Sequence, residues 1–122
     1  MRRWSDAPVS RTVRVAALFL AVAAAGCAGG MASLPAAEQL HAAGAAEVGM
    51  DVGALRRGRI VLVTECAACH RLFLPEEYPP EQWRGIVGRM ASRASLDAGQ
   101  AADLELYLTA ASRTAARKKG GR

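Results

Sequence analysis

The 122-residue sequence lacks an apolar helix of the usual length for crossing a membrane. Its most apolar run, residues 15–26, has about 12 residues, whereas a spanning helix needs roughly 20. Four arginines and one aspartate precede this run, and small residues end it. Because this order is typical of a secretory signal, residues 1–26 are predicted to be a signal peptide, and the rest of the chain is expected to be exported.

The residues at the end of this signal, Ala24-Ala25-Gly26-Cys27, resemble the lipobox of bacterial lipoproteins, in which the cysteine is acylated. Alanine stands at position 24, where that family usually has leucine. The resemblance implies a lipoprotein-type signal, lipidation of Cys27 and a periplasmic protein anchored to a membrane. The alternative is ordinary cleavage after small residues, which would leave a soluble periplasmic protein with a free thiol at Cys27.

Signals for β-strands are also scarce. Aromatic residues make up 5% of the sequence, and residues 60–63 are its only run typical of a strand. Three segments have helical signals instead. The first begins at Asp51 or Gly53, the second at Pro80, and the third after Asp97, which a glutamine follows at capping-box spacing. The sequence therefore predicts an all-α, compact domain of about three helices.

The remaining segments are compositionally biased. Residues 27–52 are rich in alanine and glycine and contain no aromatic residue, which predicts a tether before a domain at residues 53–112. Residues 113–122 form a basic tail with five basic and no acidic residues. This tail lacks the interleaved aromatic residues typical of nucleic-acid binding, so no nucleic-acid partner is expected.

Metal-binding residues are few, since the sequence has three cysteines and two histidines. Cys66-Ala67-Ala68-Cys69 is followed directly by His70. A structural zinc site needs four ligands, and these residues with the distant His41 do not readily supply them. A thioredoxin-like disulfide belongs beside a βαβ pattern that the chain lacks. C-x-x-C-H is the motif that attaches a c-type haem through two thioether bonds, with the histidine as an iron ligand.

With this motif behind an export signal, residues 53–112 resemble a small monohaem class I-like cytochrome c. The resemblance implies an all-α fold around one covalent haem c. It implies that Cys66 and Cys69 form the thioether bonds and that His70 is the proximal iron ligand. Met90, on the second predicted helix, corresponds to the distal iron ligand of such cytochromes.

The same resemblance suggests further contacts with the haem. Trp83 and Tyr78 are expected in the haem pocket, and both are candidates, with Arg71 and Arg84, to donate hydrogen bonds to the haem carboxylates.

Gly58 precedes Cys66 by eight residues and matches the small residue on which the family packs an aromatic of its last helix. That aromatic residue is Tyr107 here.

A haem with both axial positions filled exchanges one electron at a time. The expected function is therefore electron transfer, either as a periplasmic, membrane-anchored carrier or as the haem subunit of a redox complex. Redox proteins are the expected partners, and the sequence shows no catalytic constellation, so an enzyme is not expected. The alternative is a haem-based sensor or small-ligand binder with Met90 labile or absent from the iron, which would leave His41, water or an open position there.

Overall fold

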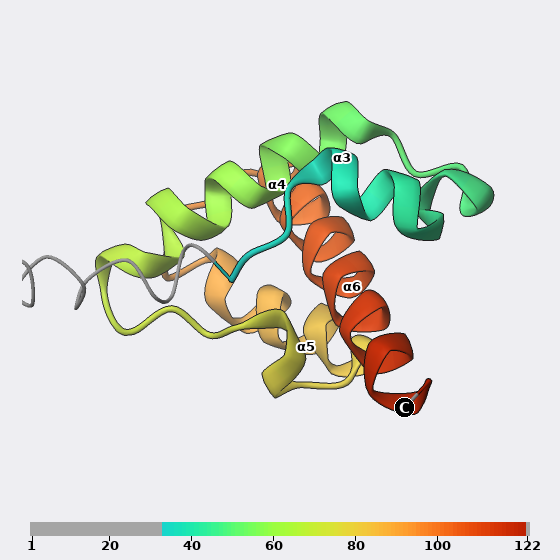
Figure 1. The fold of residues 1–122 in the computed structure, drawn as a ribbon. Coiled ribbons are helices and arrows are strands. Elements are labelled where there is room, and N and C mark those ends of the chain that lie inside the picture. Colours follow the sequence, from blue (N-terminus) through green and yellow to red (C-terminus); the bar gives the residue numbers. More distant parts are fainter. Residues whose placement is uncertain (1–32, 122) are drawn as a thin grey trace, which may run out of the picture.

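The computed structural model describes residues 33–121, and this part of the chain is helical and contains no strand (Figure 1). Its elements in chain order are α3 (Ala37–Leu40), a π-helical turn (His41–Ala45), a 3-10 turn (Ala46–Val48), α4 (Val52–Thr64), two more 3-10 turns (Cys66–Ala68 and Pro75–Glu77), α5 (Pro80–Ala91) and α6 (Ala98–Gly120). The predicted all-α class is confirmed. The described residues form four helices, one more than expected, because α3 lies in the segment predicted to be a tether.

The three predicted helices begin where local chemistry favours a start. The Asp51 carboxylate accepts a hydrogen bond from the Ala54 amide at 2.8 Å and caps α4. Proline at the first position opens α5, where its missing N–H costs nothing. Asp97 and Gln100 form a reciprocal capping box at α6, with bonds of 2.8 and 3.0 Å.

The central helix is α6, because both α4 and α5 pack against it. At Gly58 the backbone of α4 approaches α6 closely. A Cβ atom added there would lie 2.6 Å from the Asp103 carbonyl carbon and 2.8 Å from Tyr107 Cβ. The predicted packing of Tyr107 on Gly58 is therefore confirmed, and a residue without a side chain is needed at this crossing.

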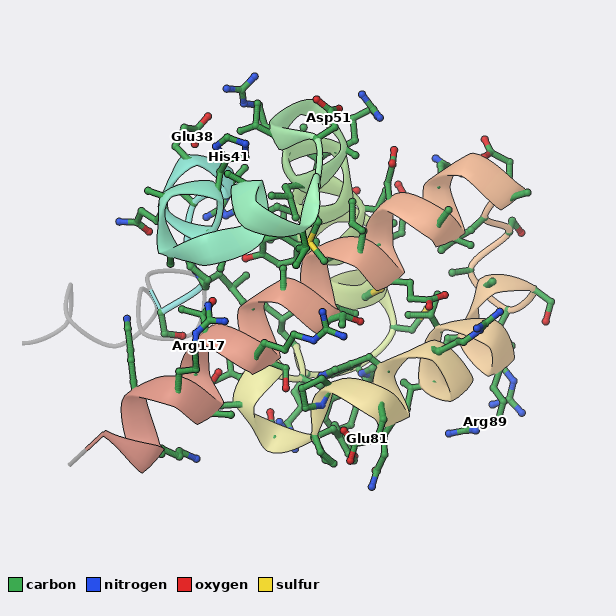
Figure 2. All side chains as sticks on the ribbon, turned by 90° about the vertical axis from the view of Figure 1, so that its right-hand side faces the viewer. Glu38, His41, Asp51, Glu81, Arg89 and Arg117 are labelled. Atoms are coloured by element: carbon green, nitrogen blue, oxygen red, sulfur yellow. The ribbon has the colours of Figure 1, made fainter. Side chains whose placement is uncertain are left out.

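The prediction of a tether is wrong for residues 34–50, which fold onto the helices and are called the N-terminal strap below. Figure 2 shows Arg117 of α6 beneath the helical turn that carries His41, and this arginine donates a hydrogen bond to the Ala43 carbonyl at 2.5 Å. The Tyr107 hydroxyl donates to the Pro35 carbonyl at 2.8 Å. Alanine and glycine dominate the strap, but its apolar residues are spaced to reach the core.

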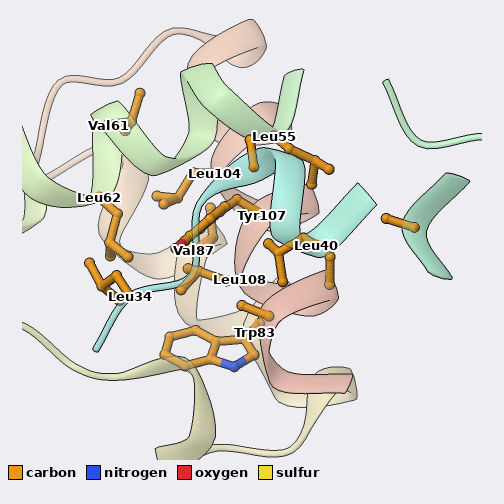
Figure 3. Close-up of a cluster of buried hydrophobic side chains, with 14 residues drawn as sticks. Leu34, Leu40, Leu55, Val61, Leu62, Trp83, Val87, Leu104, Tyr107 and Leu108 are labelled. Carbon is orange, nitrogen blue, oxygen red and sulfur yellow. The ribbon is translucent and has the colours of Figure 1, made fainter. Parts of the chain in front are cut away.

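The core contains residues from the strap and from all three longer helices (Figure 3). Its larger side chains with at most 6% exposure are Leu34, Leu40, Leu55, Val61, Leu62, Trp83, Val87, Leu104, Tyr107 and Leu108. Burying one leucine or phenylalanine stabilises a fold by about 1.5–3 kcal/mol. The two strap leucines therefore add materially to a domain that has few aromatic residues.

The predicted signal peptide and Cys27 lie outside the described residues. Within residues 33–121, none of the helices combines the length and the apolar character that a membrane span requires. The predicted basic tail continues α6 as helix up to Gly120.

Candidate functional site

One large cavity lies where the end of α4, the loop 66–79, α5 and the first half of α6 meet. Its volume is about 780 Å³, which falls in the range of roughly 300–1,000 Å³ usual for ligand pockets. Its walls include six residues singled out from the sequence: Cys66, Cys69, His70, Tyr78, Trp83 and Met90. The fold thus brings together the predicted thioether cysteines, the two predicted iron ligands and the two aromatic residues expected in the haem pocket.

The two cysteines reach the cavity because α4 ends at Thr64 and a single 3-10 turn follows. Both thiols are free, with Cys66 half-buried and Cys69 exposed. Burial raises the pKa of the Cys66 thiol, and the Glu65 carboxylate adds to the effect, so this thiol stays protonated at neutral pH. A raised pKa is the opposite of what a redox-active or metal-binding thiolate shows.

The zinc alternative finds no support in the described residues. Across positions 33–121, no three histidine, cysteine or acidic side chains gather closely enough to hold a metal ion. Structural zinc is held by four such ligands. The cysteine pair therefore lacks the companions that a zinc site would require.

The His70 ring is oriented by its own neighbour. Its Nδ1 atom lies 2.7 Å from the Arg71 carbonyl oxygen. Because a carbonyl oxygen only accepts hydrogen bonds, Nδ1 carries the hydrogen in this contact and Nε2 keeps its lone pair. In the neutral ring this contact fixes the tautomer and leaves Nε2 without a hydrogen, as in histidines that bind a metal through Nε2.

A clamp of side chains holds the loop that follows His70. The Arg71 guanidinium donates to both Glu77 carboxylate oxygens, at 2.9 and 2.7 Å, and lies 4.3 Å from the centre of the Phe73 ring. Glu77 also accepts from the Leu74 amide at 2.6 Å. Arg71 and then this amide lower the pKa of Glu77 to about 2. Arg71 is engaged with Glu77 and does not line the cavity, so the structure does not favour it as a carboxylate donor.

Three aromatic rings continue from His70 into the core. Phe73 meets the His70 ring edge-on at 5.2 Å, Tyr78 meets Phe73 at 6.0 Å, and Trp83 meets Tyr78 at 5.3 Å. The Trp83 indole N–H donates to the Pro75 carbonyl at 3.1 Å, and the residue is 2% exposed. Trp83 therefore forms a wall of the cavity with its ring, and its single N–H already has an acceptor.

Helix α5 forms the wall that carries Met90. This half-buried methionine lines the cavity together with Ile86, one turn earlier on the same face. Gly85 also lines it, and a Cβ atom added there would touch only the Arg89 guanidinium, at 3.4 Å. The absence of a side chain at Gly85 therefore leaves this part of the wall without a bulky group.

Two arginines at this wall were missed by the sequence analysis. Arg89 and Arg93 are exposed, line the cavity and form no ion pair within residues 33–121. Arg84 was considered instead, but it does not line the cavity and lies 4.0 Å from the Glu105 carboxylate. The position of Arg89 and Arg93 directly before and three residues after Met90 was the signal that could have identified them.

His41, the other candidate for the distal position, lies in the strap and is not among the residues that line the cavity. Of the two candidates, only Met90 shares a cavity with His70.

The residues present fit a covalently attached, flat, iron-containing group. The wall offers two free thiols, an imidazole with Nε2 available and a thioether, and aliphatic and aromatic side chains surround them. Thioether bonds and His/Met ligation of a c-type haem need this set of donors. Two unpaired arginines at the rim match the carboxylates that such a group carries.

Residues 62–121 match the family model described as dihaem cytochrome c. Neither a curated protein nor a solved structure matches the chain. The matched segment contains Cys66, Cys69, His70 and Met90, and it supports a cytochrome c-like family with haem-based electron transfer. The family's name speaks of two haems, whereas the sequence contains one C-x-x-C-H motif.

Proposed function

We propose that this cytochrome c-like chain is a one-electron carrier, with one c-type haem in the cavity between α4, α5 and α6. The convergence of two thiols, an imidazole and a thioether on one apolar cavity carries this proposal. The four groups come from three parts of the chain: the turn after α4, the loop after it and α5. Such a convergence has no structural purpose of its own, because free cysteines and an exposed histidine add little to a core.

Each donor has a distinct role in the proposal. Cys66 and Cys69 form the thioether bonds, and His70 is the proximal ligand through Nε2. Met90 is the distal ligand. A haem bound in this way supplies a reversible one-electron couple, and methionine opposite histidine raises its potential.

The proposal assigns one haem to each chain. Covalent attachment through C-x-x-C-H needs two cysteines and the following histidine, and this pattern occurs once. Cys27 is the third cysteine, and alanine follows it. If the assembled protein contains two haems, as the family name suggests, the second needs a C-x-x-C-H motif outside these 122 residues.

The rim arginines have a role in binding. Arg89 and Arg93 are proposed to pair with the haem carboxylates, because both face the cavity and lack acidic partners among the described residues. Charge-assisted hydrogen bonds of this kind are about twice as strong as neutral ones. Glu65 and Glu81 line the same cavity. Repulsion from their side chains would turn the haem carboxylates away from these two residues.

A carrier fits better than a sensor because Met90 lies on a regular helix. Packing of α5 against α6 holds this helix in place. Two residues of α5 itself, Trp83 and Val87, are buried. A haem-based sensor with an open or labile distal site is the alternative, and it would need Met90 to leave the iron.

The cellular setting is part of the proposal. Export by residues 1–26 would bring the chain to the compartment in which c-type haem is attached, and lipid on Cys27 would hold it at a membrane. Its partners would be redox proteins that donate and accept single electrons. A soluble periplasmic form is the alternative if Cys27 is not acylated.

The test is the haem content and the visible spectrum of protein exported from cells that attach c-type haem. We expect one haem per chain that survives denaturing electrophoresis and is lost in Cys66→Ala/Cys69→Ala. The ferric protein should show the far-red band of methionine–iron ligation. Met90→Ala should abolish this band.

The matched control is Met50→Ala, because Met50 is also half-buried but lies outside the cavity. Retention of the far-red band in Met90→Ala, or its loss in Met50→Ala, would refute the assignment of the distal ligand. Carbon monoxide binding to the unmodified ferrous protein would favour the sensor. Absence of covalent haem would refute the proposal altogether.

A further inference from the structure

The C-terminal end of α6 carries exposed cations without acidic partners. Arg113, Arg117, Lys118 and Lys119 are all exposed. No ion pair within residues 33–121 involves any of them, and Glu105 is the last acidic residue of the sequence. Basic residues at a helix C-terminus offset its dipole, but this effect is confined to the last turn. Arg113 lies about two turns before the end, so the dipole does not account for the whole cluster.

An exposed apolar side chain lies beside two of these cations, Arg113 and Arg117. Val48, at the end of a turn in the strap, is 64% exposed. Together with Arg113 and Arg117 it lines a shallow groove of about 50 Å³ between the strap and α6. Val48 and the four cations are called the α6-end surface below.

The α6-end surface is remote from the haem cavity. The part of α6 that lines the cavity ends at Leu108, and Lys119 lies about 16 Å further along the helix axis. Figure 2 shows Arg117 and the cavity residue Arg89 on opposite sides of the molecule. A redox protein bound at this surface would keep its own centre far from the haem. The position therefore favours a partner that needs no electron path.

We propose that the α6-end surface docks on a membrane surface of anionic lipids. Cations beside an exposed apolar side chain are the combination that binds at a lipid interface, where the charges meet head groups and the apolar group enters the boundary region. Docking through this end would leave the cavity mouth free for redox partners.

The membrane contact does not require lipid on Cys27, although the two would act together. One acyl chain gives only marginal, reversible membrane binding, and a basic surface is a common second signal. The inference also stands apart from the proposed function, because it involves none of the cavity residues.

The test measures binding of the exported, haem-loaded protein, with Cys27→Ser to remove any acyl chain, to two kinds of vesicle. One is pure phosphatidylcholine and the other contains phosphatidylglycerol. We expect binding only to the anionic vesicles, weakened by salt. Each cation near such a surface contributes roughly a fivefold change in partitioning, so Lys118→Gln/Lys119→Gln should lower partitioning by about tenfold or more.

The matched control is Arg56→Gln/Arg84→Gln, which removes the same charge from exposed side chains elsewhere. Its partitioning should fall by less than about threefold, since distant charges are screened within roughly 10 Å. An equal loss in both double variants would show dependence on net charge alone and would overturn the proposal. Equal binding to both vesicle types, or to neither, would also overturn it.

Haem content and the visible spectrum are recorded on the same samples. If haem is absent but anionic vesicles are still bound, the proposed electron-transfer function fails and the membrane surface stands. If the spectrum is as expected and vesicles are not bound, the reverse holds.

Discussion

Gly58→Ala should destabilise the domain more than any other single added methyl group that we consider. The new Cβ would lie 2.6 Å from the Asp103 carbonyl carbon and 2.8 Å from Tyr107 Cβ. Ordinary contacts begin near 3.4 Å. The clash is with backbone, so no side-chain rotation relieves it, and α4 must move from α6 by about 0.8 Å or more.

The expected loss can be estimated from two opposing effects. Alanine favours a helix over glycine by about 1 kcal/mol, whereas overpacking a tight contact costs about 1–3 kcal/mol and sometimes more. Because this clash involves backbone and a buried ring, we expect a net loss of about 2 kcal/mol. A change of this size lowers the melting temperature of a domain this small by roughly 10 °C.

The assay is urea and thermal unfolding of the haem-loaded protein, with haem yield measured in parallel. Gly88→Ala is the control, because nothing lies within 4 Å of its added Cβ on α5. It should gain up to about 1 kcal/mol from helix propensity. If Gly58→Ala were as stable as Gly88→Ala, the close crossing of α4 and α6 would be refuted.

Other predictions concern the cavity and its supports. Gly85→Leu adds a bulky side chain at the cavity wall and should prevent most covalent haem attachment. Gly88→Leu adds the same side chain outside the cavity and should leave the haem yield unchanged. Equal haem yields in the two variants would refute the placement of the haem against α5. Trp83→Phe should cost about 1–3 kcal/mol in urea unfolding, because the Pro75 carbonyl loses its buried donor. Glu77 has its pKa lowered from 4.5 to about 2, so its stabilising effect is present above pH 4.5 and is lost as the pH falls towards 2. Glu77→Gln should therefore show a flatter fall in unfolding free energy across that window, and parallel curves would contradict the clamp.

Parts of the fold could be predicted because their signals are local. The starts of α4, α5 and α6 depend on Asp51, Pro80 and Asp97, and each acts within one turn of its own position. The crossing at Gly58 was predicted from the resemblance to cytochromes c, which pack an aromatic of the last helix on a small residue at this distance from the first cysteine. The cysteine pair and His70 were identified by their spacing together with the predicted export signal.

The strap could not be predicted from composition. Alanine and glycine are typical of linkers, but alanine also allows close helix packing when larger residues are spaced correctly. Leu34 and Leu40 provide that spacing, and both are at most 5% exposed. Their partners on α4 and α6 are distant in sequence, and Tyr107 bonds to Pro35 across 72 positions. Only the tertiary structure brings these residues together.

The charged groups were predicted less well than the apolar ones for a related reason. The sequence does not distinguish an exposed arginine that pairs with an acidic side chain, as Arg71 does with Glu77, from one that lines a cavity, as Arg93 does. The difference depends on where acidic side chains end up after folding. Of the arginines suggested from the sequence as carboxylate donors, Arg71 and Arg84 do not line the cavity, whereas Met90, suggested as the distal ligand, does.

The two sides of α6 explain why such a short domain can hold a large cofactor. Tyr107 faces the strap and α4, where the core is closed by protein side chains alone. Leu104 and Leu108 also reach the cavity on the other side, where apolar surface remains uncovered in the protein itself. The strap thus supplies apolar packing on one side of α6, where the domain has few aromatic residues to fill the core. A covalently held haem would supply it on the other, which is why removing the strap and removing the haem should damage different halves of the same core.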